Sequence, residues 1–523
     1  MKGLIFEALS SQADAATNRT DVACLIGFAK LRDIDTPVAL TEWLQHEGWW
    51  ATVTSAGEQG GAKSLYDVPL PLHSWEQFDQ LFEWDQRVYG DEAIQDASYQ
   101  GASYLGAAVR SFFAQGGRKC FVISLGEPLA LADDRAARDA MLLQLVPLYS
   151  GQRSRRREWH GLHHLLGLPE VSFVTMPDLA ELAAVYREDS VTPVEVPPPE
   201  PQFVECSQPT VAAAADKRVI YLSAPHCTDA EYAIWRTVVR RAAQWLSDFR
   251  RDAQLLVALP LPHKESEAAH DLLAFMHREA WLSGTLQTSN SLATAFLQLA
   301  YPWLQMNYAG DLPANLEPPE GIMAGLLARN ALTRGTFRSA TAVAIHDVVD
   351  FSPRLAQSQQ FALNPAAPSQ ASPQAPLIDR VSLIGPTVEG FRLLSDVTTS
   401  NDISYRQANI NRTIALVMRA ARAIGEEYLF DASGERLWQQ IQNRLGDVLA
   451  AMQAAGALAG QRPQDAFQVR CDRSTMTQQD IDNGRVIVIV MIRPVASIET
   501  MRIQLAIGDG GRVSLSALGM EAA

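Results

Sequence analysis

Apolar runs alternate with amphipathic helical stretches in the first quarter of the chain. Residues 22–28 form a continuous apolar run that is typical of a buried strand. Residues 74–82 and 104–114 place apolar side chains at helical spacing and predict two helices. Gly116 and Gly117 favour a left-handed end to the second helix, and residues 119–124 predict a strand directly after it. The order helix, glycine turn and apolar strand indicates an α/β layer.

The same alternation continues through the middle of the chain. Residues 171–174, 219–222 and 255–259 predict strands, with long helical patterns between the last two and after them. Two proline-rich stretches interrupt the pattern, at residues 192–208 and 364–376. Because proline lacks the backbone donor that helices and central strands need, we expect an exposed loop at the first stretch and a linker at the second.

Two helical stripes follow a strand that is predicted near residues 381–384. The apolar stripes consist of Ile410, Ile414, Val417, Met418, Ala421 and Ile424 in the first helix, and of Leu437, Ile441, Leu445, Val448, Leu449 and Met452 in the second. Residues 485–492 then form a continuous apolar run, which is typical of a strand buried on both faces. Residues 501–507 and 512–518 alternate apolar and polar positions on either side of a glycine-rich break, and each predicts a further strand.

Composition narrows the class of protein. The 523 residues are too many for one ordinary core, so we expect about two to four domains. A formal net charge of −15 argues against a general nucleic-acid binder, and no apolar run is long enough to predict membrane insertion. The first residues lack the apolar core of a signal peptide, so folding in the cytosol is expected. The cysteines are scattered without CxxC spacing, which favours buried thiols: Cys24, Cys120, Cys206, Cys227 and Cys471.

Residues 57–64 (GEQGGAKS) nearly match a phosphate-binding P-loop. That loop needs a glycine just before the lysine and a helix straight after it, so that backbone N–H groups can close on phosphate. Here Ala62 precedes the lysine, and the prolines that follow do not favour a helix. We therefore expect a surface loop at this position and no nucleotide site.

Two histidine-containing segments are further candidates for a metal or catalytic site. The sequence HGLHH at residues 160–164 lacks an acidic residue and follows the arginines at 155–157, so the start of a helix is favoured over a metal site. His226 and Cys227 are adjacent, and adjacent strand residues usually point to opposite faces, which disfavours a catalytic pair. Without GxSxG, HExxH or GxGxxG motifs, we expect no enzyme and no cofactor; a cytosolic α/β enzyme with an unrecognised active site is the alternative.

Three arginines lie off the apolar stripe of the helix that contains residues 410–424. Arg412, Arg419 and Arg422 are spaced so that they come near one another on the helix surface. One interpretation is a solvated or salt-bridged face. The other is contact with the acidic surface of a partner protein.

Many segments, in the same order along most of the chain, resemble the contractile tail sheath family, which includes the sheaths of phage tails and of extracellular contractile injection systems. Residues 19–29 resemble its first core strand, and residues 104–122 resemble its helix, glycine turn and strand. The other matching segments are 74–82, 301–303, 318–329, 334–340, 363–365, 430–438, 456–460, 467–472, 475–485 and 493–496. The family's usual Pro-Gly-Val-Tyr start is absent, and the loop at 192–208 resembles an insertion.

The resemblance implies an α/β protein with mixed sheets. Its inner domain would combine residues 21–129 with 380–510, and residues 130–379 would form an inserted outer domain. Residues 1–20 and 511–523 would be terminal arms. The family builds stacked hexameric rings around an inner tube and contracts without a nucleotide or cofactor. Implied partners are other copies of the chain, an inner tube protein, and baseplate and cap proteins, with assembly in the cytosol.

The two chain ends are predicted to link neighbouring copies by strand exchange. Leu4, Ile5 and Phe6 are apolar but are followed by a polar tether, so they have no obvious place in their own core. The pattern at residues 512–518 lies beyond the glycine-rich break, with Val513, Leu515 and Ala517 on one side. The sheet formed by residues 485–492 and 501–507 would offer an open edge to such strands. The arginines Arg412, Arg419 and Arg422 are the candidates for contact with an acidic tube.

Overall fold

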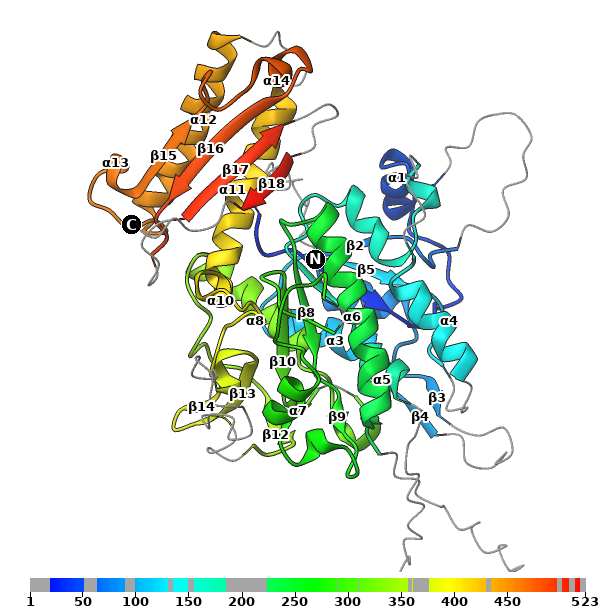
Figure 1. Cartoon of the computed structure of the whole chain (residues 1–523). Coiled ribbons are helices and arrows are strands. Elements are labelled where there is room, and N and C mark those ends of the chain that lie inside the picture. Colours follow the sequence, from blue (N-terminus) through cyan, green and yellow to red (C-terminus); the bar gives the residue numbers. More distant parts are fainter. Residues whose placement is uncertain are drawn as a thin grey trace, which may run out of the picture.

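The structure is a computed structural model of the full chain. It describes residues 19–50, 64–89, 99–129, 135–148, 155–184, 223–288, 290–308, 310–355, 360, 376–428, 434–495, 501–507 and 513–517. The described residues form two units with separate hydrophobic cores. We call residues 19–407 the main unit and residues 408–517 the C-terminal unit. Figure 1 shows the C-terminal unit, coloured from yellow through orange to red, beside the larger main unit.

A mixed sheet of eight strands forms the centre of the main unit. Its six inner strands are parallel, and an antiparallel strand closes each edge. In spatial order the strands are β14 (Gly390–Leu393), β13 (Ser382–Thr387), β10 (Leu297–Tyr301), β8 (Gln254–Ala258), β6 (Phe173–Thr175), β1 (Ala23–Gly27), β5 (Cys120–Ser124) and β2 (Leu70–Leu72). The inner strands are buried and mostly apolar, except for the exposed end of β13, because both faces of the sheet are covered, as is usual for parallel sheets.

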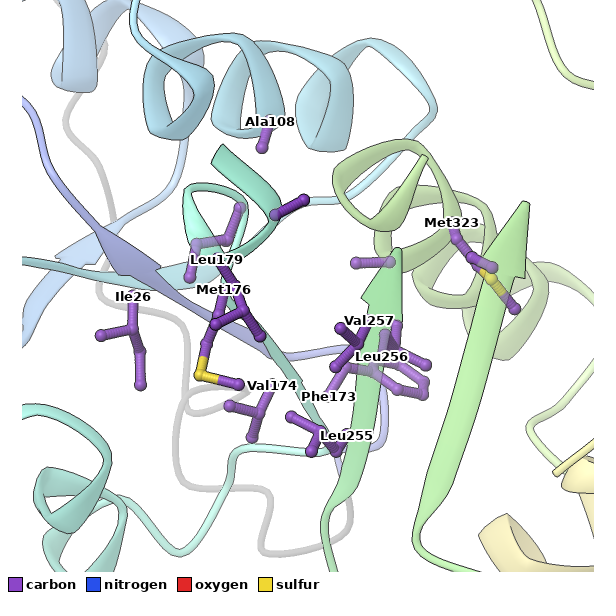
Figure 2. Close-up of a cluster of buried hydrophobic side chains, with 14 of the residues drawn as sticks. Ile26, Ala108, Phe173, Val174, Met176, Leu179, Leu255, Leu256, Val257 and Met323 are labelled. Carbon is purple, nitrogen blue, oxygen red and sulfur yellow. The ribbon is translucent and has the colours of Figure 1, made fainter. Parts of the chain in front are cut away.

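Helices cover this sheet and complete the main core. They are α1 (Val38–His46), α2 (Trp75–Leu81), α3 (Tyr104–Ala114), α4 (Arg135–Leu145), α5 (Leu179–Ala183), α6 (Asp229–Phe249), α7 (Leu272–Arg278) and α8 (Glu320–Thr333). Helices α3 and α8 pack against each other and both contact β1. Figure 2 shows their side chains Ala108 and Met323 above buried strand residues such as Val174 and Val257. Side-chain caps fix some helix starts: Thr228 and Glu231 form a capping box at α6.

Three short strand pairs lie outside the main sheet. They are β3 (Arg87–Tyr89) with β4 (Tyr99–Gly101), β7 (His226–Cys227) with β9 (Leu261–Pro262), and β11 (Trp303–Met306) with β12 (Val348–Ser352).

The C-terminal unit is a four-stranded antiparallel sheet packed on long helices. The strand order is β15 (Phe467–Arg470), β16 (Val486–Ile492), β17 (Met501–Ile507) and β18 (Val513–Ala517). Its helices are α11 (Ala408–Glu427), α12 (Glu435–Ala454), α13 (Pro463–Ala466) and α14 (Gln478–Asp482), and the short α10 (Ile403–Arg406) leads into α11. The predicted apolar stripes of α11 and α12 join β16 in one buried cluster.

The predicted α/β class is confirmed, and most predicted elements are present within one or two residues of their expected ends. The strand predicted at 485–492 is β16, and the left-handed helix end predicted after residue 114 occurs at Gly116, with φ of +102°. The predictions for residues 4–6, 192–208 and 219–222 fall outside the described residues, as do most of the P-loop-like segment and of the linker at 364–376.

The chain divides into units at a different place from the one expected. Residues 21–129 and 380–510 were expected to share a domain, but β1, β2 and β5 lie in the same sheet as β6, β8 and β10. One continuous core runs from Val22 to Leu393, and a second core begins at Ile410. The reason is that β1 pairs with β5 on one side and with β6 on the other, so the first segment cannot leave the second. Which unit faces inward in an assembly stays a prediction.

Candidate functional site

The four-stranded sheet is the element that the sequence predicted to link copies of the chain. Strand β16 pairs with β17 over its whole length, from Val486 opposite Ile507 to Ile492 opposite Met501. Strand β18 then pairs with β17 in the same chain, which places Val513, Leu515 and Ala517 opposite Ile507, Leu505 and Ile503. The edge of β17 that was expected to be open is therefore filled by the chain's own carboxyl-terminal strand, and this corrects the expectation.

The two outer edges of this sheet are now β15 and β18. Within the described residues, β15 pairs with β16 on one side only. Gln468 and Arg470 are exposed, while Val469 points into the core. An edge strand keeps one row of backbone donors and acceptors available for a further strand. The sheet thus retains the ability to extend, at edges other than the predicted one.

The amino-terminal arm leaves the described fold next to this unit. Leu4, Ile5 and Phe6 lie outside the described residues, which begin at Arg19. The backbone carbonyl of Arg19 accepts a hydrogen bond of 2.8 Å from Nη1 of Arg419 on α11. The arm therefore starts at the junction between the two units, close to the C-terminal unit.

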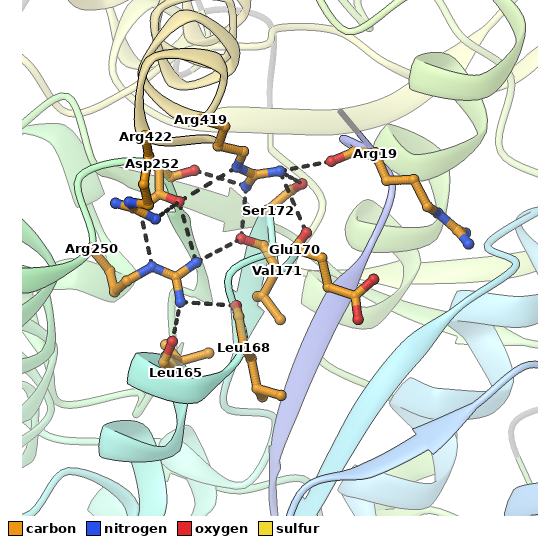
Figure 3. A network of polar contacts seen from close by, with 10 residues as sticks. All are labelled: Arg19, Leu165, Leu168, Glu170, Val171, Ser172, Arg250, Asp252, Arg419 and Arg422. Carbon is orange, nitrogen blue, oxygen red and sulfur yellow. Dashed lines mark hydrogen bonds and ion pairs between the residues drawn. The ribbon is translucent and has the colours of Figure 1, made fainter. Parts of the chain in front are cut away.

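The three arginines predicted to face a tube are instead engaged inside the chain. Arg412 and Arg419 are 6% and 5% exposed, and the side chain of Arg422 is 19% exposed. Arg412 donates to Asp396, with Nη1 at 3.0 Å from Oδ1. Figure 3 shows Arg419 and Arg422 gathered around Asp252 of the main unit. This placement corrects the expectation of a tube contact and matches the salt-bridged alternative.

Asp252 is the centre of this group. Arg250 Nε lies 3.0 Å from Asp252 Oδ1, Arg422 Nη1 lies 3.1 Å from Oδ2, and Arg419 Nε lies 3.5 Å from Oδ2. Burial alone would raise the pKa of the Asp252 carboxyl, but the charges of these arginines outweigh it and hold the pKa well below its usual range. Burial lowers the pKa of Arg419 to about 10, so its guanidinium keeps its charge at neutral pH.

The histidine cluster has a carboxylate partner that the sequence did not reveal. Asp67 lies 2.6 Å from His160 Nδ1 and 3.0 Å from His164 Nε2, and its Oδ1 accepts a hydrogen bond from the Gly161 backbone. Burial would raise the pKa of Asp67, but these hydrogen bonds, with His164 foremost, lower it. His163 stacks on the ring of Trp245. Within the described part of the chain, no group of three or more histidine, cysteine or acidic side chains is arranged to hold a metal ion.

The candidate thiol pair has no catalytic geometry. Cys227 is buried, and burial raises the pKa of its thiol well above the ordinary value. His226 Nδ1 is engaged with the Ala224 carbonyl oxygen at 2.6 Å. Cys24, Cys120 and Cys471 are also buried free thiols, as predicted, while Cys206 lies outside the described residues. A thiol that stays protonated is a poor nucleophile.

Membrane insertion was not expected from the sequence. Across the residues that the structure describes, none of the helices has both the length and the apolar character required to cross a membrane.

Chains from contractile particles share this fold. A chain in the cryo-EM structure of the anti-feeding prophage (AFP) baseplate in its contracted state matches with a TM-score of 0.55 and 17% identity, over 95% of this chain and 95% of that chain. A chain of the PVC sheath complex, from an extracellular contractile injection system in its contracted state, matches with a TM-score of 0.51 and 15% identity, over 95% of each chain.

A third chain, from the six-fold symmetrised AFP baseplate, matches with a TM-score of 0.51 and 16% identity, over 92% of this chain and 91% of that chain. No family model matches the sequence, and no curated protein matches it. At these identities the likeness establishes a common fold, which extends over both units.

Proposed function

We propose that this chain is the repeating structural subunit of a contractile sheath. Copies of it stack as hexameric rings around an inner tube and contract to drive the tube through a target envelope. The observation that supports this most is the extent of the common fold, which covers 95% of this chain and 95% of a chain in a contracted injection-system sheath complex. A single shared domain would align only part of each chain, whereas here the main unit and the C-terminal unit align together.

The C-terminal sheet is proposed as the link between copies. Its edge strands β15 and β18 keep backbone groups that a strand of another copy can pair with. The arm of residues 1–18 starts beside α11, and extended chain covers about 3.3 Å per residue, so the arm can reach roughly 60 Å. Leu4, Ile5 and Phe6 would then pair with the sheet of a neighbouring copy.

Strand β18 takes part in the same exchange. It makes its ladder with β17 of its own chain here. An identical ladder forms when β18 of one copy pairs with β17 of the next, because exchange of an identical element between copies preserves every backbone hydrogen bond. Val513, Leu515 and Ala517 belong to this exchanged strand.

An inner tube protein, and baseplate and cap proteins, are the further partners in this proposal, with assembly in the cytosol. Support for the baseplate contact comes from the two AFP baseplate structures that contain chains of the same fold. The buried positions of Arg412 and Arg419 mean that other residues must contact the tube.

Electron microscopy of the purified full-length chain tests the proposal. We expect rings, or hollow tubes built from stacked rings, at protein concentrations where a discrete enzyme would remain a small particle. Addition of a chelator or of ATP should leave these assemblies unchanged. A particle no larger than one or two copies under every condition, or a stoichiometric nucleotide in the purified protein, would contradict the proposal and favour the enzyme alternative.

A further inference from the structure

Helix α11 is buried on two opposite faces. Its apolar stripe, including Ile414 and Val417, belongs to the core of the C-terminal unit. The other face carries Arg412, Arg419 and Arg422, whose spacings of seven and three residues place them along one side of a helix. That side lies against the main unit, so α11 belongs to one unit through apolar contacts and to the other through polar contacts.

The polar contact combines ion pairs with hydrogen bonds to backbone carbonyl oxygens, and we call its charged part the charge seam. Its residues are Arg250, Asp252, Asp396, Arg412, Arg419 and Arg422. Asp396 holds the amino-terminal part of α11 through Arg412, and Asp252 holds its carboxyl-terminal half through Arg419 and Arg422. Asn409 extends the seam by donating from Nδ2 to the Phe337 carbonyl oxygen at 2.9 Å.

The charge seam holds more positive than negative charge. Its four arginines face two aspartates, which leaves an excess of two positive charges among these six residues. Backbone carbonyl oxygens partly compensate the excess positive charge. Arg419 donates hydrogen bonds to the carbonyl oxygens of Val171, at 2.7 Å, and of Asp252, at 2.9 Å. Loss of either aspartate should therefore destabilise the contact between the units more than loss of any one arginine.

The seam is also incompletely packed. A cavity of about 10 Å³ lies between α11 and β8, lined by residues that include Gln254, Arg412 and Arg419. Gln254 is 2% exposed, and neither its amide nitrogen nor its amide oxygen has a hydrogen-bond partner within the described part of the chain. A cavity of this size is just large enough for one water molecule. The contact between the units is thus mainly polar, unlike the two cores that it joins.

We propose that the charge seam is a docking joint that fixes the C-terminal unit on the main unit, with Asp252 as its central residue. The two units have separate buried cores, and only a few partly buried side chains of the main unit, Phe337 and Tyr405 in the described part of the chain, pack against the C-terminal core. Separation at the seam would therefore expose mostly polar groups. In a sheath, the joint would set the position of the sheet that links copies, and this last step rests on the proposed function. The joint itself is a property of the single chain and is testable without any assembly.

Chemical labelling of arginine in the full-length chain tests the joint. In the docked state Arg419 is buried, so a dicarbonyl reagent such as phenylglyoxal should modify it slowly. Asp252→Asn keeps the shape of the side chain but removes the charge. We expect labelling of Arg419, measured by mass spectrometry, to become on the order of tenfold faster, because removal of one partner from a buried ion-pair network is strongly destabilising. Asp248→Asn, an exposed change on α6, is the matched control and should leave the rate unchanged.

The integrity of each unit is measured in the same samples. Amide hydrogen exchange in β1 and β16 should remain as slow in Asp252→Asn as in the unchanged protein, since each strand lies in its own core. If Asp252→Asn does not fold, the double variant Asp252→Asn with Arg422→Gln replaces it, because that pair of changes restores the original charge excess.

The charge excess gives a second, independent expectation. Arg422→Gln alone should leave Arg419 protected, since Arg250 and Arg419 continue to hold Asp252. The double variant should label more slowly than Asp252→Asn. The proposal is overturned if Asp252→Asn leaves the labelling of Arg419 unchanged, or if Arg422→Gln exposes Arg419 as strongly as Asp252→Asn does. None of these outcomes depends on whether the chain forms a sheath.

Discussion

At the scale of single residues, the main core contains carboxyl groups that hold their protons. Glu317 is 1% exposed, accepts a hydrogen bond of 2.5 Å from Ser111 Oγ, and has a second oxygen without a partner among the described residues. Burial raises the pKa of Glu317 to about 8, and it raises the pKa of Glu320 to about 8 and of Asp178 to about 7. These side chains are neutral in the folded protein at moderately acidic pH, where the unfolded chain would have lost the protons.

This difference predicts a fall in stability as pH rises. Glu317 loses its proton near pH 4.3 in the unfolded chain and near pH 8 in the folded one. Its stabilising contribution to the unfolding free energy is therefore complete below about pH 4.3 and is lost as the pH rises through about 8. Glu317→Gln should reduce the slope of the unfolding free energy by up to about 1.4 kcal/mol per pH unit across this window. Urea unfolding at several pH values measures the slope. Glu426→Gln, an exposed change, should leave it as it is, and equal slopes for all three proteins would refute the assignment.

The sequence could not predict which side chains contact the arginines and histidines of the candidate site. Periodicity placed Arg419 and Arg422 on one side of a helix, and it left open whether an internal or an external partner lay opposite. The partner Asp252 lies 170 positions before Arg422 in the sequence, and Asp67 lies 97 positions before His164. No local pattern connects such residues, because the sheet order brings them together.

At the scale of elements, the close packing of α3 against α8 depends on two glycines. A Cβ atom on Gly321 would lie 2.6 Å from the Ala108 backbone, and a Cβ atom on Gly325 would lie 2.4 Å from the Phe112 carbonyl oxygen. Both distances are shorter than any van der Waals contact, so glycine allows the helix backbones to approach. This gives a physical reason for the glycines in the segment 318–329 that resembles the sheath family.

Replacement of these glycines should therefore destabilise the main unit. We expect Gly321→Ala to lower the unfolding free energy by about 1–3 kcal/mol, because an added methyl group in a packed interface forces the helices apart. Gly446→Ala is the control, since Gly446 lies in α12 with no atom near its Cβ position. That change should stabilise by about 0.5–1 kcal/mol, because alanine favours a helix more than glycine does. Thermal or urea unfolding of both variants measures the difference, and a neutral Gly321→Ala would show that the helices can separate without cost.

Most elements could be predicted from the sequence because their signals are local. The stripes of α11 and α12 and the apolar run of β16 each repeat with the period of their own structure. The short edge strand β2 contains Pro71 and was not predicted, since proline disfavours a strand unless it lies at an edge. Whether a strand lies at an edge depends on the other strands of the sheet, so the three residues of β2 alone do not predict it.

At the scale of the whole molecule, the division into two units was the main feature that the sequence did not predict. Residues 21–129 precede a long segment that was expected to be a separate insertion, yet β1 lies between β5 and β6 in one sheet. Parallel neighbours are joined by crossovers of many residues, so adjacency in space carries little trace in the sequence. The C-terminal unit was also expected to begin too early, at residue 380, because β13 and β14 belong to the main sheet, and to end too early, at residue 510, because β18 belongs to the C-terminal sheet.

Truncations test how copies of the whole molecule are linked. Deletion of residues 1–18, or of residues 512–523, should leave a folded, soluble chain that does not form tubes, because each deletion removes one of the strands proposed to pair between copies. Circular dichroism checks the fold, and electron microscopy checks for tubes. Replacement of the proline-rich loop at 192–208 by a short Gly/Ser linker is the control and should still permit tubes. Tubes from both truncated chains would contradict strand exchange.

The position of β1 also determines how the molecule bears mechanical load. Any tension on the amino-terminal arm enters the fold through Arg19 and runs along β1. Five residues of β1 are in register with β5 on one side, and three are in register with β6 on the other. These ladders lie across the direction of pull, so their hydrogen bonds must shear together, whereas an edge strand such as β2 can be peeled away one bond at a time. The arm is therefore anchored on an interior strand that is paired on both sides, where extraction requires both ladders to break.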